Sequence, residues 1–539
     1  MLKTFNVDKL SVRVFEDRDK MGKDAALAIS EKIKELLSHK ETINMIFAAA
    51  PSQNDMIDAL IHTSGIDWSR INAFHMDEYI GLSEDAPQGF GNFLRDRIFS
   101  KVNFKSVNYI NGQAEDIKSE CERYSKLLIE NPVDIVCMGV GENGHIAFND
   151  PPVADFNDKA LVKEVKLDEI CRNQQVNDGC FDSIDKVPVS ALTLTIPALV
   201  GADYIFCVVP AATKRNAVFS MLRGKISEKC PASILRTREN AILFCDKQSA
   251  QDVLFRKAII TDEATQDFEK ACALAKKYNY EAVELRSVWD TKPHELTDGQ
   301  ISQINEIAKK YELKICAISS AVFKCDMNNE TEVKEQFDML EKCVALAVKT
   351  GAGFVRIFTF WKNNGIEKDL EIIKSHIAKA ADYAKEYGIT LVVEQDPSVS
   401  VCNSDEMKIL FDSLDIENVK VLWDPGNQIY NEVYKVPYPD GYELIKDSIC
   451  HIHLKDAIRK EDGTPEGVVI GSGMLDVKGI LNELLKINYE GFIVQEPHFR
   501  IASNISEDKL KLPGGSAFSE GGFEASELCM QKFENIVFN

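Results

Sequence analysis

The chain has 539 residues, which is more than one hydrophobic core supports, so we expect at least two domains. Hydrophobic residues make up 45% and charged residues 27%, values typical of folded globular proteins that exclude disorder and fibrous repeats. The net charge of −22 argues against nucleic acid and anionic membranes as partners, because like charges repel at long range. Small anionic substrates stay open, since a few positive groups in a pocket act at short range.

Cysteine spacing and the start of the chain bear on the cellular compartment. The 14 cysteines are never closer than nine positions, as between Cys171 and Cys180, which excludes a C-x-x-C redox or zinc unit. The beginning of the chain lacks the apolar core of a signal peptide, and the most apolar window, 191–212, is interrupted by proline and aspartate. We therefore expect a cytoplasmic protein with no membrane contact.

The first section of the chain alternates short β-branched runs with longer amphipathic stretches, which is typical of βα units. This pattern predicts an α/β domain over residues 1–250, with an open, doubly wound parallel sheet of Rossmann-like type. The predicted strands are 43–50, 71–79, 134–141, 202–210 and 241–245.

From residue 251 onward the same alternation becomes regular, and its eight repeats predict a (β/α)8 TIM barrel over residues 251–539. The polar segment 245–252 is the predicted boundary, and the tail from residue 504, with a helix near its end, is predicted to close the barrel. The predicted barrel strands are 254–260, 281–285, 314–318, 353–358, 390–394, 420–424, 449–454 and 491–496.

Polar residues follow two predicted strands of the first section. Asp77 and Glu78 end one of them, and His145 lies in a glycine-rich segment, 139–150, that follows another. Ligands of open α/β sheets bind at the carboxyl ends of strands. An Asp beside a substrate carbon can carry a proton and an imidazole can act on a ring oxygen, which indicates isomerase chemistry. The alternative for the acidic pair is a solvated strand end.

Five segments in this order carry a family resemblance over about residues 1–250: FHMDEYIGL, NGQAED, GVGENGHIAFND, VPVSALTL and PAATKRNAV. They resemble the glucosamine-6-phosphate deaminase/isomerase family. The resemblance implies that Asp77 moves a proton between C2 and C1 and that His145 assists opening of the pyranose ring. It also implies that Lys214 holds the 6-phosphate and that this domain needs no cofactor.

Several positions depart from that family's pattern. Asn143 stands where the family usually has Asp, and Asp150 where it usually has Glu, so any carboxylate support of His145 is expected from Asp150. The usual glycine-rich turn after the first strand is replaced by a segment in which Ser52 can donate to an anion or simply cap a helix. Arg172 is the candidate for the family's phosphate-binding arginine.

Two alternatives for the first section follow from these departures. A 6-phosphogluconolactonase-like hydrolase shares the glycine-rich segment, although the residues around Asp77 favour the deaminase branch. A domain that binds a sugar phosphate without converting it, as a sensor for the barrel, is favoured by the uncharged Asn143.

Four ionisable residues end four consecutive predicted strands of the barrel section: Glu394, Asp424, His453 and Glu496. The carboxyl ends of barrel strands meet at one mouth, where three carboxylates would repel unless a cation neutralised them. We therefore predict a divalent metal, and Mn²⁺, Mg²⁺, Co²⁺ and Zn²⁺ all suit this donor set. Each carboxylate taken singly could be a solvated strand end, and His451 is a rival to His453 as the ligand.

This quartet resembles the metal site of the xylose isomerase-like barrel family of sugar isomerases and epimerases. The resemblance implies that Glu394 and Glu496 exchange protons at adjacent carbons of the substrate. Arg356, Lys455 and Glu284 could line the substrate pocket or form buried ion pairs. The related metal-dependent AP endonucleases are disfavoured because the chain is acidic and offers only one quartet.

Together these patterns predict a bifunctional carbohydrate enzyme. The first domain would convert a hexosamine 6-phosphate to a ketohexose 6-phosphate and ammonia, and the barrel would isomerise or epimerise a sugar or sugar phosphate. Sugar phosphates are the expected small-molecule partners, and self-association into a homo-oligomer stays open.

Overall fold

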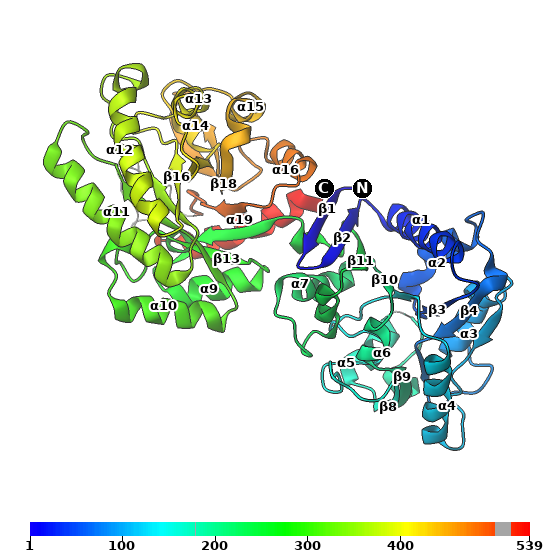
Figure 1. The fold of residues 1–539 in the computed structure, drawn as a ribbon. Helices are drawn as coiled ribbons and strands as arrows, with labels where there is room; N and C mark the ends of the chain where they lie inside the picture. Colours follow the sequence, from blue (N-terminus) through cyan, green and yellow to red (C-terminus); the bar gives the residue numbers. More distant parts are fainter. Residues whose placement is uncertain (178, 502–518, 539) are drawn as a thin grey trace. The chain divides into compact units, whose positions relative to one another are not determined.

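In the first half of the chain, buried apolar runs form an eight-stranded sheet with the order β1-β2-β11-β10-β7-β3-β4-β6 (Figure 1). The computed structural model describes residues 1–177, 179–501 and 519–538. It divides into two units, Met1–Leu254 and Phe255–Asn539. The strands of the large sheet are β1 (Lys3–Val7), β2 (Leu10–Phe15), β3 (Ile43–Phe47), β4 (Ile71–His75), β6 (Ser106–Asn108), β7 (Ile135–Met138), β10 (Tyr204–Val209) and β11 (Ala241–Asp246).

The helices of this unit cover the sheet and connect its strands. The first helix begins after Asp17, whose carboxylate accepts a hydrogen bond from the backbone N–H of Lys20. It buries Met21, Ala25 and Ile29 at helical spacing in the core of the sheet. The helices are α1 (Arg18–Leu37), α2 (Asn54–Ile61), α3 (Phe90–Leu94), α4 (Ile117–Glu130), α5 (Glu169–Asn177), α6 (Ile196–Val200) and α7 (Arg215–Arg223), with the short 3-10 turns η1 (Pro51–Gln53) and η5 (Ala212–Lys214).

The open α/β fold predicted for this half is confirmed, with two differences in detail. The edge strand β1 pairs antiparallel with β2, so the sheet is not parallel throughout. The predicted strand 71–79 is two strands: β4 belongs to the large sheet, and β5 (Asp77–Tyr79) belongs to a small antiparallel sheet with β8 (Val162–Lys166) and β9 (Ser190–Leu194). The chain changes sheets at Met76, which sets Asp77 just beyond the end of β4.

The second half forms the predicted closed barrel, in which each of the eight predicted strands overlaps an observed one. All neighbouring strands pair in parallel, and the last pairs with the first. The barrel strands are β12 (Arg256–Ile260), β13 (Ala282–Leu285), β14 (Lys314–Val322), β15 (Phe354–Ile357), β16 (Thr390–Glu394), β17 (Val419–Trp423), β18 (Ile449–Leu454) and β21 (Phe492–Gln495).

Helices alternate with the barrel strands, and a hairpin of β19 (Asp456–Arg459) and β20 (Pro465–Val468), which the sequence patterns did not predict, follows β18. The final helix, α19, contacts α8, and its Glu534 forms an ion pair of 2.5 Å with Lys257 of β12. Residues 504–518 of the predicted tail lie outside the described residues. The helices are α8 (Thr261–Ala264), α9 (Phe268–Lys277), α10 (Asp298–Lys310), α11 (Glu330–Thr350), α12 (Ile366–Glu386), α13 (Ser404–Ser413), α14 (Asn427–Tyr430), α15 (Tyr442–Ile445), α16 (Val477–Lys486) and α19 (Gly522–Phe538).

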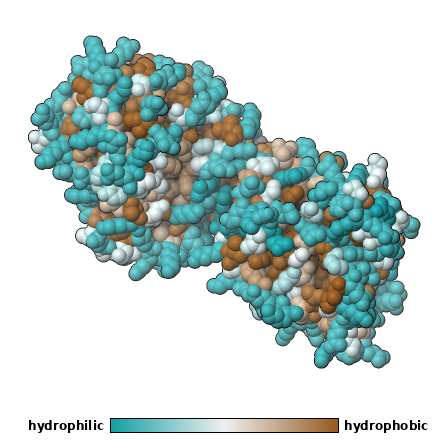
Figure 2. All heavy atoms as spheres, in the orientation of Figure 1, coloured by the Kyte–Doolittle hydropathy of each residue, from teal (hydrophilic) through white to brown (hydrophobic). Residues whose placement is uncertain are grey.

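The surface agrees with this division into buried cores and solvated helices. The face drawn in Figure 2 carries mainly hydrophilic residues, with hydrophobic residues in separate groups between them. Within residues 1–177, 179–501 and 519–538, no helix combines the length and hydrophobicity needed to cross a bilayer.

Candidate active sites

A cavity of about 150 Å³ lies over the carboxyl ends of four adjacent parallel strands, β10, β7, β3 and β4. Each strand is followed by a short segment that lines the cavity, which is the expected binding position in an open α/β sheet. The charged and polar side chains of its lining are Arg18, Ser52, Asp77, His145, Gln174, Gln175, Thr213 and Lys214.

Asp77 is buried at the edge of this cavity, with only 7% of its surface exposed. Burial, with a smaller contribution from the charge of Glu78, raises the pKa of Asp77 well above its usual range. Glu78 is also buried, and its carboxylate accepts hydrogen bonds from the backbone N–H groups of Tyr79, Phe90 and Gly91. The alternative of a solvated acidic pair is therefore wrong: Glu78 organises backbone, and Asp77 is left beside the cavity.

His145 is held on one side of its ring by two neighbours from the same segment. Its Nδ1 lies 2.7 Å from Oδ1 of Asn143 and 2.9 Å from Oδ1 of Asp150, and Asn143 in turn donates its amide N–H to Asp150. Burial would raise the pKa of Asp150, but hydrogen bonds from His145 and Asn143 outweigh it and lower that pKa below its ordinary value. A charged Asp150 therefore supplies the negative charge beside the imidazole that the neutral Asn143 lacks.

The ring of His145 lies directly over the backbone of Gly141. A Cβ atom at Gly141 would lie 2.1 Å from Cε1 of His145, so a larger residue cannot stand there without displacing the ring. This close approach explains why a glycine stands at position 141.

Two loops with anion-binding character line the other part of the cavity. Ser52 lies in η1 after β3, and Thr213 and the buried Lys214 lie in η5 after β10. The sequence patterns did not single out Arg18, which also lines the cavity and forms an ion pair of 2.5 Å with Asp55. Arg18 reaches the cavity because α1 packs against α2, and no local sequence motif reveals this tertiary contact.

The structure does not bring Arg172 to this cavity. Its guanidinium donates to the backbone carbonyl oxygens of Ile184 and Val187, at 2.7 and 2.9 Å, and the described residues that line the cavity do not include it. Arg172 thus fastens α5 to the following loop, and its assignment as a phosphate ligand is not supported. The same helix reaches the cavity through Gln174 and Gln175 instead.

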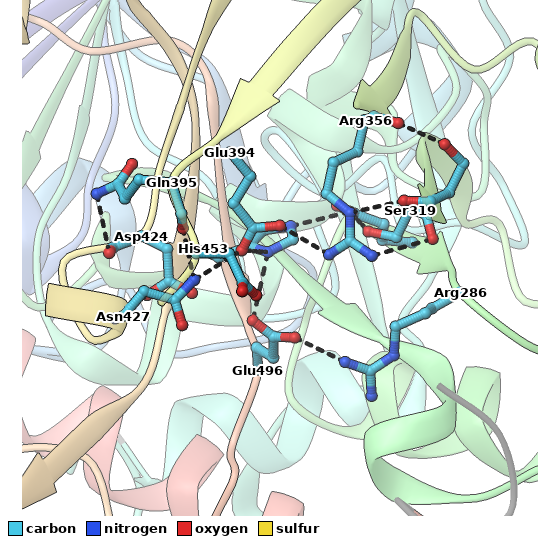
Figure 3. A network of polar contacts seen from close by, with 12 residues as sticks. Arg286, Ser319, Arg356, Glu394, Gln395, Asp424, Asn427, His453 and Glu496 are labelled. Atoms are coloured by element: carbon cyan, nitrogen blue, oxygen red, sulfur yellow. Dashed lines mark hydrogen bonds and ion pairs between the residues drawn. The ribbon is translucent and has the colours of Figure 1, made fainter. Parts of the chain in front are cut away.

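In the barrel, the four predicted residues converge at the carboxyl ends of consecutive strands (Figure 3). One ligand atom from each lies within 4.8 Å of the others, and all four side chains are at most 3% exposed. Nδ1 of His453 is 3.4 Å from Oε2 of Glu496 and 3.7 Å from Oε1 of Glu394. The residues of this centre are Glu394, Asp424, His453 and Glu496.

Three cationic side chains neutralise the carboxylates of this centre. Lys455 forms ion pairs with Asp424 and Glu496, the latter at 2.8 Å, and Arg356 donates to Glu394 at 2.9 Å. A second guanidinium, from Arg286, lies 2.6 Å from Oε1 of Glu496 (Figure 3). Arg356 and Lys455 are therefore buried ion-pair partners of the quartet, which is one of the two arrangements anticipated for them.

The protonation of the carboxylates differs within the centre. Burial and the charges of Glu496 and Glu394 raise the pKa of Asp424 to about 7 in spite of Lys455. Burial also acts on Glu394, but Arg356 and His453 lower the pKa of this group below its ordinary value. The glutamates are thus held charged, whereas the protonation of Asp424 would respond most strongly to an added positive charge.

The donor set fits a divalent cation. Three carboxylates and one imidazole form an oxygen-rich group of the kind that Mn²⁺, Mg²⁺, Co²⁺ or Zn²⁺ accepts. Nδ1 of His453 is buried and makes no hydrogen bond with any described residue, although it faces the centre. His451 lies outside this group and binds Glu284 instead, with Nε2 2.7 Å from Oε2.

Two residues that sequence reasoning missed also reach the centre. Asn427 donates its amide N–H to Oε1 of Glu394 at 3.1 Å, and His498 lies 3.4 Å from Oε1 of Glu496. Both stand two or three positions beyond a predicted ligand, so the residues that follow each strand end were the signal available in the sequence.

Comparison with known proteins agrees with the geometry of the first half. Residues 16–244 match the family described as glucosamine-6-phosphate isomerases/6-phosphogluconolactonase. A glucosamine-6-phosphate deaminase of Clostridium acetobutylicum is 32% identical over 247 residues, which are 45% of this chain and 99% of that protein. Through its first half, this chain belongs to the glucosamine-6-phosphate deaminase family. A solved structure of a monomeric glucosamine-6-phosphate deaminase is 30% identical and covers 44% of this chain and 98% of its own, with a TM-score of 0.41.

The second half matches a different family. Residues 272–511 match the family described as xylose isomerase-like TIM barrel. A solved xylose isomerase domain protein from Planctomyces limnophilus is 13% identical, with 45% of this chain and 90% of that chain covered and a TM-score of 0.37. The two family matches confirm both resemblances noted in the sequence, one for each half of the chain.

Proposed function

We propose that the first half of this fused protein deaminates and isomerises a hexosamine 6-phosphate to a ketohexose 6-phosphate and ammonia. The observation that carries this proposal is the placement of a buried, raised-pKa Asp77 and of His145 on one cavity. Asp77 takes the proton from C2 of the opened sugar and returns it at C1. Water then replaces the nitrogen at C2, and ammonia leaves.

The other residues of the cavity have supporting parts in this reaction. Asn143 and Asp150 hold Nδ1 of His145, which leaves its Nε2 for the ring oxygen of the substrate. Ser52, Thr213 and Lys214 bind the 6-phosphate from the ends of β3 and β10. The backbone N–H groups of the adjoining turns add to this positive potential.

The test is release of ammonia from glucosamine 6-phosphate and galactosamine 6-phosphate by the full chain. Turnover of either sugar is expected, and failure with both across a range of pH would refute the deaminase proposal. A lactonase-like activity would instead appear as acid release from 6-phosphogluconolactone, which the same preparation can be offered. Asp85→Asn, a change at an exposed loop residue, is the matched control for carboxylate substitutions.

For the barrel we propose isomerisation or epimerisation of a sugar or sugar phosphate, dependent on a divalent cation. The convergence of Glu394, Asp424, His453 and Glu496 within 4.8 Å supports it. A bound cation would polarise the carbonyl and hydroxyl of a substrate. Glu394 and Glu496 come from β16 and the end of β21, and they move protons at adjacent carbons of the substrate.

The two reactions fit one after the other, because the first yields a ketose and ketoses are substrates of the second kind of site. The 14 cysteines are free thiols, which accords with a reducing compartment and supports the proposal of a cytoplasmic enzyme. Metal analysis of the purified protein, with a panel of ketoses and sugar phosphates, tests the barrel. A protein that binds none of the four metals and converts none of the sugars would refute this half of the proposal.

A further inference from the structure

A second polar cluster lies next to the proposed cation centre, built around Glu284 of β13. This carboxylate is fully buried. Its Oε1 accepts from Nε2 of His453 at 2.9 Å, and its Oε2 accepts from Nε2 of His451 at 2.7 Å. The hydroxyl of Ser319 also donates to Oε1. One carboxylate thus joins two imidazoles from the same strand, β18.

The contact with Glu284 decides which face of His453 is available to the centre. A carboxylate accepts hydrogen bonds and donates none, so Nε2 of His453 carries the proton in this contact. Its Nδ1 is then the atom with a free lone pair, and that atom is buried beside Glu496 and Glu394. A lone pair and two carboxylates repel, so a positive charge, either a proton on Nδ1 or a bound cation, relieves the repulsion here.

We infer that Glu284 is a positioning residue, whose carboxylate fixes the ring of His453 so that Nδ1 points into the four-residue centre as a ligand. The inference rests on the proposed cation site. Ligand histidines in metalloproteins often donate their other N–H to a carboxylate, and loss of that partner typically costs about 10–100-fold in metal affinity.

His451 serves this arrangement by holding the other oxygen of Glu284. Its ring packs against Phe354, with ring centroids 5.3 Å apart, and lies outside the group of residues that converge on the cation centre. With both oxygens engaged, the carboxylate cannot rotate away from His453. His451 is therefore an anchor of the positioning residue rather than a second ligand.

Among the described residues, the basic groups in contact with the carboxylate of Glu284 are the two imidazoles rather than an arginine or lysine. Buried carboxylates are normally neutralised by a cation, and two buried arginines are close in the fold. Arg356 is directed to Glu394, however, and Arg286 to Glu496, Asp262 and Glu263. The carboxylate of Glu284 contacts His451, His453, Ser319 and the thiol of Cys316.

The test compares Glu284→Gln with Ser319→Ala in the full chain, stripped by chelator and titrated with Co²⁺. The amide can accept from one imidazole only, so we expect Co²⁺ affinity to fall about 10–100-fold and the visible Co²⁺ spectrum to change. Ser319→Ala removes a donor to the same carboxylate without touching either imidazole. The Co²⁺ affinity of Ser319→Ala should stay within about twofold of wild type, even if its melting temperature changes.

Two outcomes separate this inference from the proposal beneath it. A wild-type protein that binds no Co²⁺ overturns the cation site and the inference together. A wild-type protein that binds Co²⁺, with unchanged affinity and spectrum in Glu284→Gln, overturns the inference alone.

A measurement on the wild type covers the case in which Glu284→Gln does not fold. In Zn²⁺-loaded protein labelled with ¹⁵N-histidine, NMR distinguishes the two imidazole tautomers, and His453→Gln identifies the signal among nine histidines. We expect the proton of His453 on Nε2. A proton on Nδ1 would contradict the inference.

Discussion

The two halves bury carboxylates for opposite purposes. In the first half, Asp77 is buried beside Glu78, and its pKa rises well above the usual range. In the barrel, Glu394 and Glu496 are equally buried, but Arg356, Arg286 and Lys455 hold them charged. Burial alone favours the protonated form of a carboxyl group, whereas burial beside cations keeps the carboxylate charged.

Removal of metal is the strongest test of that contrast. After chelation, we expect the barrel reaction to be lost and ammonia release from the first half to be unchanged, because among the described residues the groups with more than one carboxylate around a shared centre lie in the barrel. Separate assays of the two reactions, before and after Mn²⁺, Mg²⁺, Co²⁺ or Zn²⁺ is returned, measure this. Loss of both activities on chelation would contradict the expected difference between a metal-independent first half and a metal-dependent barrel.

Asp77→Asn is expected to abolish the proton transfer, with ammonia release reduced by at least about 10²–10⁴-fold and the barrel rate retained. The same change should stabilise the first half at neutral pH, because a buried charge is removed; each kcal/mol gained raises the melting temperature by about 2–4 °C. Asp85→Asn should change neither ammonia release nor the melting temperature. A sensor domain would instead keep its ligand affinity and show no ammonia release in the wild type.

Arg356→Gln leaves Glu394 buried without its cation, and we expect a cost of about 3–5 kcal/mol in the metal-free barrel. Thermal unfolding in chelator measures it, and part of the loss should return when a divalent cation is added. The matched control is Lys349→Gln, which breaks an exposed pair with Asp298 and should leave the melting temperature unchanged. Equal melting temperatures for both variants would show that the buried pair contributes no more to stability than the exposed pair.

Gly141→Ala should displace the ring of His145, since the added Cβ would lie 2.1 Å from Cε1. A shift of about 1 Å in a catalytic group costs on the order of 10²-fold, so ammonia release should fall by that amount. Gly299→Ala, which has no neighbour within 4 Å of the added atom, is the control and should keep full activity. Full activity in Gly141→Ala would mean that ammonia release does not depend on the position of the His145 ring.

The pH profile of ammonia release gives the smallest expected effect. Asp77 accepts a proton only when ionised, and its pKa is raised, so the acidic limb of kcat/KM should lie clearly above pH 4. The raised pKa also makes the stability of the first half depend on pH. Because the pKa of Asp77 is higher in the folded than in the unfolded state, its contribution to stability decreases as pH rises from about 4 towards the folded pKa. An acidic limb at the ordinary pKa of an aspartate would place the proton carrier elsewhere.

Much of the fold followed from local patterns. The eight barrel strands and the central strands of the first sheet are mostly apolar runs, and such runs are typical of buried parallel strands. The strands missed in the first half, β1, β2, β6, β8 and β9, lie at or next to an edge of the large sheet or in the small sheet. Edge strands carry mixed burial, so their sequence pattern is weak; the residues 3–7 of β1 are an example.

The candidate sites divide in the same way. Residues at strand ends, such as Asp77, Glu394 and Glu496, could be predicted because parallel strands bring their carboxyl ends together by topology. Arg172 was predicted from its position in the family pattern, and the structure directs its guanidinium to two backbone carbonyls instead. Where a long side chain points depends on its three-dimensional neighbours, which local sequence does not specify.

The sequence by itself determined which residue types stand at the strand ends, and so the two families and the chemistry each half can attempt. Only the tertiary structure decided how each group is charged and aimed. It paired Glu394 with Arg356, buried Asp77 next to Glu78, and set Glu284 behind His453. The physical reason is that pKa and orientation depend on contacts a few ångströms away in space, between residues that lie tens or hundreds of positions apart in the chain.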